Sequence, residues 1–197
     1  PNIAECFSRS HATFLILGPQ CTRSCSFCNV AKGKPSLPDK GEPARIARAV
    51  KKLALKHVVV TSVTRDDLTD GGAGIFADTI LNIRSTTPQT TIEVLIPDFQ
   101  LSLDSLRAVV ESGPDIIAHN VETVPSLYRS VRQGSDYKRS LDVLKTIKKI
   151  SSGIKTKSGI MLGLGEKESE VIAVMGDLRA IECDFLSIGQ YLAPSKL

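Results

Sequence analysis

The sequence predicts an α/β fold in which six parallel β-strands, each followed by a helix, form a partial (β/α)6 barrel of the TIM type. Short apolar runs, typical of buried parallel strands, recur at intervals of about 25–45 residues. Between them, apolar residues repeat with the three- and four-residue spacing of amphipathic helices. Six such units are too few to close an eight-stranded barrel, so we expect an open one.

The expected strands are nearly continuous apolar runs rather than strict alternations of apolar and polar residues. This pattern favours parallel strands that helices cover on at least one face. The expected strands span residues 13–17, 57–61, 91–96, 115–119, 157–162 and 184–188.

Each connection between strands carries one apolar helical face. The pair Glu42-Pro43 fits the first turn of the first helix, because proline is tolerated there. The five faces comprise Ile46, Ala47, Val50 and Leu53; Phe76, Ile80 and Ile83; Leu103, Leu106 and Val110; Leu141, Leu144 and Ile147; and Val171, Met175 and Leu178.

The composition limits the classes of function. A chain of 197 residues with 42% hydrophobic residues is long enough for one globular domain. No apolar run approaches the roughly 20 residues of a membrane-spanning helix. The net charge of +4 is mild, and no basic stripe is interleaved with aromatic residues. We therefore expect neither a membrane protein nor a nucleic-acid-binding protein.

Three of the five cysteines lie in the spacing C-x3-C-x2-C directly after the first expected strand, at Cys21, Cys25 and Cys28. An odd, clustered set of cysteines indicates metal binding in a reducing compartment rather than disulfides. Iron–sulfur clusters and structural zinc sites usually take four protein ligands. Three clustered thiols therefore predict a cluster with one iron open to substrate or cofactor.

This spacing, with the aromatic Phe27 before the last cysteine, resembles the radical S-adenosylmethionine superfamily. The resemblance implies a [4Fe–4S] cluster whose open iron binds the amine and carboxylate of S-adenosylmethionine. It also implies that an electron from the cluster splits the sulfonium to give a 5′-deoxyadenosyl radical. From the spacing alone, a zinc knuckle or a redox cysteine group remains an alternative.

Polar residues follow the other expected strands, where active-site residues gather in parallel α/β folds. Thr61 and Ser62 occupy the place where radical enzymes hold the methionyl amine, and strand-end capping is their alternative role. Asn120 and Glu122 could hold the ribose hydroxyls and the methionyl group, or form only a polar turn.

Further candidates have weaker support. Gly163 opens a glycine-containing run that lets the backbone approach a flat ring. Gln190 and Tyr191 are expected to line the adenine or acyl site. Phe27 either approaches the adenine or packs the loop. The run at residues 65–67 either forms an ion-paired loop or orients the cofactor.

Longer blocks resemble the lipoyl synthase family over the whole chain, and together they are more specific than the cysteine triplet. A relative of biotin synthase would lack the lead-in Pro-Asn-Ile-x-Glu-Cys and the block Gly-Gln-Tyr-Leu-x-Pro-Ser. The matching blocks are residues 1–7, 12–18, 21–35, 61–73, 93–98, 119–128, 131–137, 157–166 and 189–196.

The family resemblance implies a sulfurtransferase that inserts two sulfur atoms at C6 and C8 of a protein-bound octanoyl group. An unactivated C–H bond requires radical chemistry, which a cofactor supplies. In the family an auxiliary [4Fe–4S] cluster donates the sulfur, and Cys6 matches the third cysteine of its C-x4-C-x5-C motif. The implied partners are octanoylated carrier domains, of the dehydrogenase E2 or glycine-cleavage H type, and an electron donor such as ferredoxin or flavodoxin.

The same resemblance sets the expected domain organisation. Residues 1–11 would be the remnant of an N-terminal auxiliary-cluster segment, and residues 12–197 a radical barrel without its C-terminal extension. Such a chain is expected to hold the radical cluster without completing sulfur insertion. We expect a cytoplasmic protein, or a mitochondrial or plastid one in a eukaryote.

Three alternatives remain at this point. One is another sulfur-inserting radical enzyme, and another is a homologue that cleaves S-adenosylmethionine but has lost sulfur insertion. The third is a non-enzymatic zinc module that uses Cys6 together with Cys21, Cys25 and Cys28.

Overall fold

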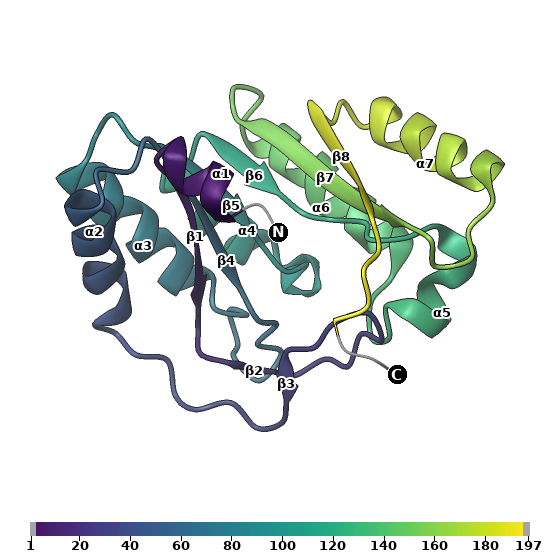
Figure 1. Cartoon of the computed structure of the whole chain (residues 1–197), viewed down its shortest axis with the longest axis horizontal. Coiled ribbons are helices and arrows are strands. Elements are labelled where there is room, and N and C mark those ends of the chain that lie inside the picture. Colours follow the sequence, from purple (N-terminus) through teal and green to yellow (C-terminus); the bar gives the residue numbers. More distant parts are fainter. Residues whose placement is uncertain (1–2, 195–197) are drawn as a thin grey trace.

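Six parallel strands lie side by side in the computed structural model, in the order β1-β4-β5-β6-β7-β8 (Figure 1). The structure describes residues 3–194, so the outermost residues of the first and last family-like blocks lie outside it. The strands are β1 (His11–Ile16), β4 (His57–Ser62), β5 (Thr91–Leu95), β6 (Ile116–Ala118), β7 (Lys155–Leu162) and β8 (Phe185–Gln190).

All six expected strands are confirmed, with shifts of a few residues at their ends. The strand β6 is shorter than expected at both ends. Asp115 lies just before it and accepts a hydrogen bond from the Ile92 backbone N–H at 2.7 Å, so its side chain occupies part of the ladder. The strand β8 runs two residues further than expected, to Gln190.

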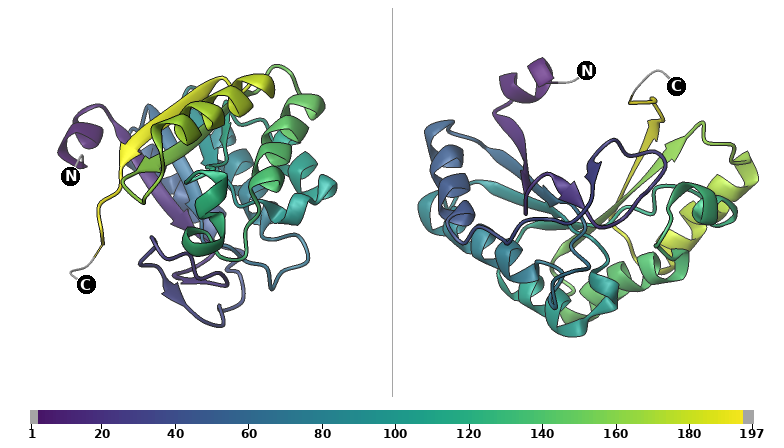
Figure 2. Two further views of the ribbon diagram at one scale, coloured as in Figure 1. Left: turned by 90° about the vertical axis from the view of Figure 1, so that its right-hand side faces the viewer. Right: turned by 90° about the horizontal axis from the view of Figure 1, so that it is seen from below.

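Helices cover the convex side of the curved sheet (Figure 2). The longer ones are α2 (Glu42–Lys52), α3 (Ala73–Thr86), α4 (Leu103–Glu111), α6 (Tyr137–Ile150) and α7 (Glu168–Ala180). No helix within residues 3–194 is long and apolar enough to cross a membrane.

The core lies between these helices and the sheet. Val58 and Val60 of β4 are fully buried there, together with Phe76 and Ile80 of α3. The continuous apolar runs of the strands thus follow from their burial against the helix layer.

The expected helical faces are correct except at three positions. Leu53 caps the end of α2 and is exposed, because that helix ends at Lys52. Leu103 of α4 and Met175 of α7 are also exposed. In α7 the buried side chains are Val174 and Leu178. This helix carries apolar residues on more than one face, so spacing alone does not identify the buried one.

Several short elements are absent from the sequence prediction. They are α1 (Ile3–Ser8), β2 (Gln20–Cys21), β3 (Ala31–Lys32), α5 (Tyr128–Val131) and the 3₁₀ turns Phe99–Leu101 and Pro125–Leu127. The pair β2–β3 closes the cysteine loop on itself as a small parallel ribbon. The assignment of residues 1–11 to an auxiliary-cluster segment stays a prediction.

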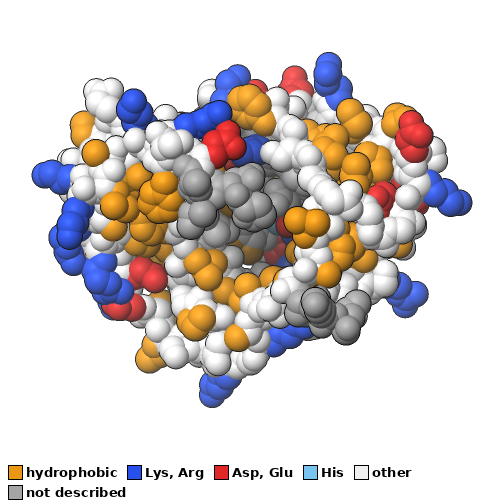
Figure 3. Space-filling model, in the orientation of Figure 1, with side chains coloured by type: hydrophobic (Ala, Val, Ile, Leu, Met, Phe, Trp, Pro, Cys, Tyr) orange, Lys and Arg blue, Asp and Glu red, His pale blue; other side chains and the backbone are white. Residues whose placement is uncertain are grey.

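The sheet is an open barrel. Within the described residues, β1 pairs only with β4 and β8 only with β7, so the two edge strands do not meet. Exposed apolar side chains lie on both edges, among them Leu15 of β1 and Phe185 and Ile188 of β8. Figure 3 shows hydrophobic side chains around the hollow of this face.

His119 is a buried histidine at the end of β6. Its Nδ1 lies 2.9 Å from the Ile96 carbonyl oxygen, and its Nε2 is buried without a partner among the described residues. Burial lowers the pKa of His119 to about 3, and the positive charge of Arg132 acts in the same direction. The ring is therefore neutral in the folded protein.

This neutrality predicts a pH-dependent stability. As the pH falls below 6.5, the unfolded chain binds a proton at this position while the folded chain does not until about pH 3. The free energy of unfolding should therefore be fully retained above pH 6.5 and decline below it. Between pH 7 and 4.5 we expect His119 to account for a loss of roughly 2–3 kcal/mol.

The test is urea unfolding of the wild type and His119→Gln at both pH values. The variant should lose less stability on acidification, whereas His11→Gln, at a partly exposed position, should behave like the wild type. If the free energy of unfolding depended on pH equally in all three proteins, His119 would not be the source of the acid sensitivity.

Candidate active site

The carboxyl ends of the central strands surround a cavity of about 180 Å³. The cysteine loop forms one wall, and the ends of β4, β5 and β6 with the connection from α5 to α6 form the others. Eight of the residues expected from the sequence line this cavity: Cys21, Cys25, Phe27, Cys28, Thr61, Ser62, Asn120 and Glu122.

The cysteine loop is held by backbone hydrogen bonds. The Arg23 N–H donates to the Cys21 sulfur at 3.4 Å, and the Cys28 N–H donates to the Cys25 carbonyl at 3.2 Å. The Ser26 N–H reaches the Val131 carbonyl at 3.0 Å. These bonds fix the three half-buried thiols on one side of the cavity.

The thiols fit a cluster better than a single ion. Within the described chain, no three Cys, His, Asp or Glu side chains converge where one metal ion could bind. A [4Fe–4S] cluster attaches each thiolate to a different iron, so its ligands do not need to meet at one point. Burial raises the pKa of the Cys25 thiol, and the charge of Arg132 opposes that rise.

Cys6 lies at the other end of the barrel. With Phe7, His11 and His57 it lines a separate cavity at the amino ends of the strands. A strand of six residues, roughly 16 Å long, separates that end from the cysteine loop. The four cysteines therefore do not form one zinc site, and the zinc-module alternative is wrong.

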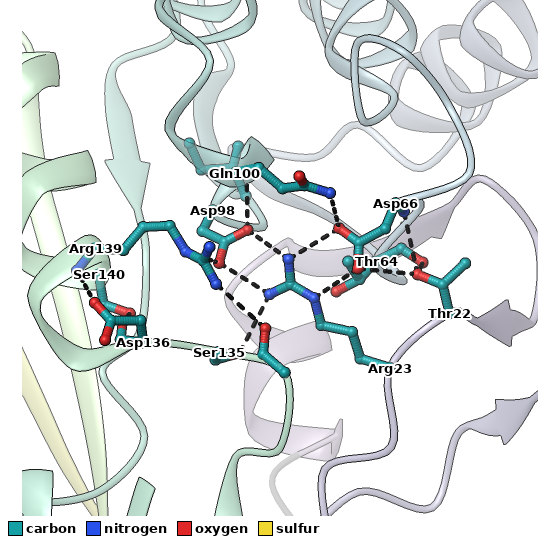
Figure 4. A network of polar contacts seen from close by, with 12 residues as sticks. Thr22, Arg23, Thr64, Asp66, Asp98, Gln100, Ser135, Asp136, Arg139 and Ser140 are labelled. Atoms are coloured by element: carbon teal, nitrogen blue, oxygen red, sulfur yellow. Dashed lines mark hydrogen bonds and ion pairs between the residues drawn. The ribbon is translucent and has the colours of Figure 1, made fainter. Parts of the chain in front are cut away.

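An ion-pair network fixes the cysteine loop to the sheet (Figure 4). The Arg23 guanidinium lies between two carboxylates. Its Nε and Nη2 donate to Asp66 at 2.7 and 2.9 Å, and its Nη1 and Nη2 donate to Asp98 at 2.9 and 2.7 Å. Asp66 follows β4 and Asp98 follows β5, so one side chain ties the loop to two strand ends.

Asp98 is the most buried member of this network, with 1% of its side chain exposed. Burial alone would raise its pKa, but the hydrogen bonds and charge of Arg23 outweigh burial and hold the pKa at about 2. Arg139 of α6 adds a second cation, 2.9 Å from the carboxylate. The network is therefore ionised at neutral pH.

The residues of the run 65–67 have different partners. Arg65 is 1% exposed and pairs with Asp67 at 2.8 Å. It also donates to the Ser36 carbonyl at 2.9 Å, which anchors the segment after the cysteine loop. Asp66 faces Arg23. The run is thus an ion-paired structural loop, one of the two roles considered from the sequence.

The strand ends place four polar groups at the cavity. The Thr61 hydroxyl donates to the Leu95 carbonyl at 3.0 Å, and the Ser62 hydroxyl is buried without a partner among the described residues. Burial raises the pKa of the Glu122 carboxyl, which Arg132 and Asn120 partly oppose. These groups can accept or donate hydrogen bonds to a polar ligand.

Backbone geometry fixes Asn120 and Glu122. Glu122 adopts a left-handed conformation, with φ of 66°, and pairs with β7 through a 2.9 Å hydrogen bond to the Gly159 carbonyl. A Cβ atom on Gly159 would lie 2.8 Å from the Asn120 amide oxygen. Only glycine leaves room for that amide at this point of β7.

Gly163, Gln190 and Tyr191 do not line the cavity. They lie together at the ends of β7 and β8, where the Gln190 amide donates to the Leu162 carbonyl at 3.0 Å. A side chain at position 163 would collide with this amide. Their expected role in binding the cofactor stays a prediction.

Comparison with known proteins identifies the family. Residues 15–178 match the model of the radical SAM superfamily. The chain is 61% identical over 196 residues to the lipoyl synthase of Geobacter metallireducens and covers 69% of that protein. The chain belongs to the lipoyl synthase family. It is also 60% identical to the lipoyl synthase of Geobacter sulfurreducens, covering 64% of its length, so it spans about two thirds of such relatives.

Solved structures of other radical enzymes share the fold. Methylornithine synthase (PylB) superposes with a TM-score of 0.71 at 18% identity, over 91% of this chain and 53% of that one. Streptococcus suis SuiB bound to S-adenosylmethionine superposes with a TM-score of 0.74 at 12% identity, over 100% of this chain and 44% of that one. This open barrel is thus a radical SAM fold on which the lipoyl synthase family is built.

Several residues that line the cavity were not predicted as site residues, among them Arg23, Asp98, Arg132 and Ser135. Arg23 lies between Cys21 and Cys25 in the sequence, and Asp98 follows the end of a strand. Their positions in the sequence could therefore have identified both as candidate site residues. Arg132 and Ser135 follow no strand, and only the tertiary structure brings them to the site.

The network predicts a defect when one partner is removed. Asp98→Asn removes one of the two negative charges that neutralise the buried Arg23 guanidinium. This loss should reduce the free energy of unfolding by about 3 kcal/mol. We also expect less iron bound after anaerobic reconstitution. Urea unfolding and iron analysis measure both. Arg45→Lys, which alters an exposed ion pair with Asp39, is the control and should change stability by less than about 1 kcal/mol.

Gly159→Ala should displace the Asn120 amide and weaken binding of S-adenosylmethionine by roughly five- to tenfold, the effect of one lost hydrogen bond. Calorimetric titration of the reconstituted protein measures this. Gly176→Ala in α7, where a Cβ would meet nothing within 4 Å, is the matched control. Unchanged affinity in Gly159→Ala would show that Asn120 does not contact the ligand.

Proposed function

We propose that this chain forms the radical-generating barrel of a lipoyl synthase, which inserts two sulfur atoms at C6 and C8 of a protein-bound octanoyl group. One observation carries the proposal most directly. Three half-buried thiols and the polar ends of β4 and β6 face the same small cavity, in a chain that belongs to this family. The long match to lipoyl synthases favours this activity over that of another sulfur-inserting radical enzyme.

In this proposal Cys21, Cys25 and Cys28 hold a [4Fe–4S] cluster and leave one iron open. The bound cluster and S-adenosylmethionine supply the carbon radical that removes hydrogen from an unactivated chain. The protein positions that cofactor. Thr61 and Ser62 offer oxygen acceptors for an ammonium group, while Asn120 and Glu122 offer an amide and a carboxyl for ribose hydroxyls and the methionyl group.

The sulfur donor is proposed to be an auxiliary [4Fe–4S] cluster with Cys6 among its ligands. Cys6 is exposed and faces the cavity at the base of the barrel. Placing the sulfur donor at one end of the barrel and the radical source at the other would put the acyl chain between them. The concave face, with Leu15 and Val59, provides apolar surface for such a chain.

Two kinds of partner follow from this activity. The substrate would be an octanoylated carrier domain of the dehydrogenase E2 or glycine-cleavage H type. Reduction of the cluster would need an electron donor such as ferredoxin or flavodoxin. The side between β1 and β8 is open and carries exposed apolar side chains, so an acyl chain could enter there without breaking a strand pair.

The first experiment is anaerobic reconstitution followed by iron and sulfide analysis and EPR of the reduced protein. About four irons and four sulfides in the radical site, with a signal that S-adenosylmethionine perturbs, are expected. Cys28→Ser should abolish this perturbation, whereas Cys183→Ser, outside the cavity, should retain it. Zinc without sulfide, or a signal insensitive to S-adenosylmethionine, would overturn the proposal.

A further inference from the structure

The connection between the cysteine loop and α2 presents three lysines and one leucine to solvent. Lys32, Lys34 and Lys40 are exposed. Leu37 is 91% exposed, more than any other large hydrophobic side chain in the described part of the chain. Figure 1 shows this connection, from β3 to α2, along the outer rim of the barrel at the carboxyl ends of the strands. We call residues 32–40 the lysine segment.

The lysine segment carries positive charge that the protein does not neutralise. Among the described residues, no ion pair joins its three lysines to a carboxylate. Its one acidic residue, Asp39, pairs with Arg45 at 2.8 Å. The nearby Glu42 carboxylate accepts a hydrogen bond from the Leu17 backbone N–H at 2.9 Å. The three lysine charges therefore make this surface complementary to an acidic partner.

The backbone of the lysine segment is held in a fixed conformation. Pro35 and Pro38 restrict its backbone dihedral angles. Between them, the Ser36 carbonyl accepts a hydrogen bond from the buried Arg65 at 2.9 Å. Leu37, the next residue, is thus presented to solvent by an ordered backbone, which lowers the entropy cost of binding a partner. An apolar side chain among charged ones is typical of a docking surface.

The lysine segment is bonded directly to a cysteine of the candidate site. In the β2–β3 pair Lys32 lies opposite Cys21, and the Gly33 N–H donates to the Cys21 carbonyl at 3.3 Å. Paired strands lie about 5 Å apart. A partner that covers Lys32 is therefore separated from the backbone of Cys21 by a single strand.

This position matters because the cavity does not admit a second protein. Its volume is about 180 Å³, which suits a small cofactor. An electron from a protein donor must therefore reach a cluster in the cavity through one of the walls. The cysteine loop is one of these walls, and the lysine segment directly follows it.

We propose that the lysine segment is the docking surface for the electron donor of this enzyme, a small acidic electron-transfer protein. Lys32, Lys34 and Lys40 pair with carboxylates around the redox centre of the donor, and Leu37 packs against an apolar part of the same surface. The donor is oxidised by one electron and the [4Fe–4S] cluster is reduced from the 2+ to the 1+ state. No proton is transferred and no bond is made or broken. This inference rests on the proposed function, because it assumes that the three thiols hold a cluster.

The first test uses reduced flavodoxin as the probe and compares the double variant Lys32→Glu, Lys34→Glu with the wild type after reconstitution. Stopped-flow absorbance follows reduction of the cluster. At low ionic strength we expect the double variant to be reduced roughly tenfold more slowly, because electrostatic steering raises association rates by about 10- to 1000-fold. At about 1 M salt, where the Debye length is about 3 Å, the difference should largely disappear.

The double variant Lys145→Glu, Lys149→Glu is the matched control. Both lysines are exposed in the second half of α6, which runs from the cavity end of the barrel toward the start of β7. This control should be reduced by flavodoxin at the wild-type rate. The methyl viologen radical cation, a small donor that needs no docking surface, should reduce neither double variant more slowly than the wild type. Leu37→Ala should slow only the reduction by flavodoxin and leave its salt dependence unchanged.

A second test locates the contact without depending on the cluster. Carbodiimide joins a lysine amine to a carboxylate that touches it. After treatment of the protein mixed with oxidised flavodoxin, mass spectrometry of the linked peptides should find the links at Lys32, Lys34 or Lys40. Links at Lys145 or Lys149 instead would overturn the proposal.

The other outcomes are also distinct. Equal rates with flavodoxin in the wild type and in Lys32→Glu, Lys34→Glu would overturn the docking surface. Equal losses with flavodoxin and with methyl viologen would also overturn it and assign the two lysines to the stability of the cluster. Wild-type protein that assembles no iron and sulfide after reconstitution would instead overturn the proposed function.

Discussion

The site depends on the ion pairs of one arginine, Arg23. This residue lies inside the cysteine loop, yet its partners Asp66 and Asp98 belong to the ends of two different strands. The loop contains only two short strands and a few turns, so its internal hydrogen bonds hold the thiols together but do not fix the loop relative to the strand ends. Charge-assisted bonds from Arg23 supply that connection to the strand ends. The position of the thiols relative to the strand ends therefore follows from electrostatics as much as from backbone geometry.

Much of the fold could be predicted from the sequence because it depends on local patterns. The continuous apolar runs gave six strands, and the cysteine spacing gave the loop that follows the first of them. The ion-pair network could not be predicted in this way, since Arg23 and Asp98 are 75 residues apart and their pairing depends on strand order. Gln190 was assigned to the adenine or acyl site because it follows an expected strand. Its amide donates to the Leu162 carbonyl at the end of β7, and its role in binding stays a prediction.

Small and unusual backbone positions complete the site. Glu122 adopts a left-handed conformation at the end of β6, and Gly159 of the next strand has no side chain where the Asn120 amide lies. Neither feature leaves a periodic pattern in the sequence. The pairing of β6 with β7 explains both features, because the two neighbouring strand ends must share the space between them. The cavity is thus shaped by pairs of strands rather than by single motifs.

The network also constrains the order in which the protein matures. Ser135 and Arg139, which contact Arg23 and Asp98, are made more than a hundred residues after the cysteine loop. During this interval the thiols belong to a chain that lacks most of the contacts that position them. The complete set of contacts that positions the thiols therefore exists only once α6 has been made.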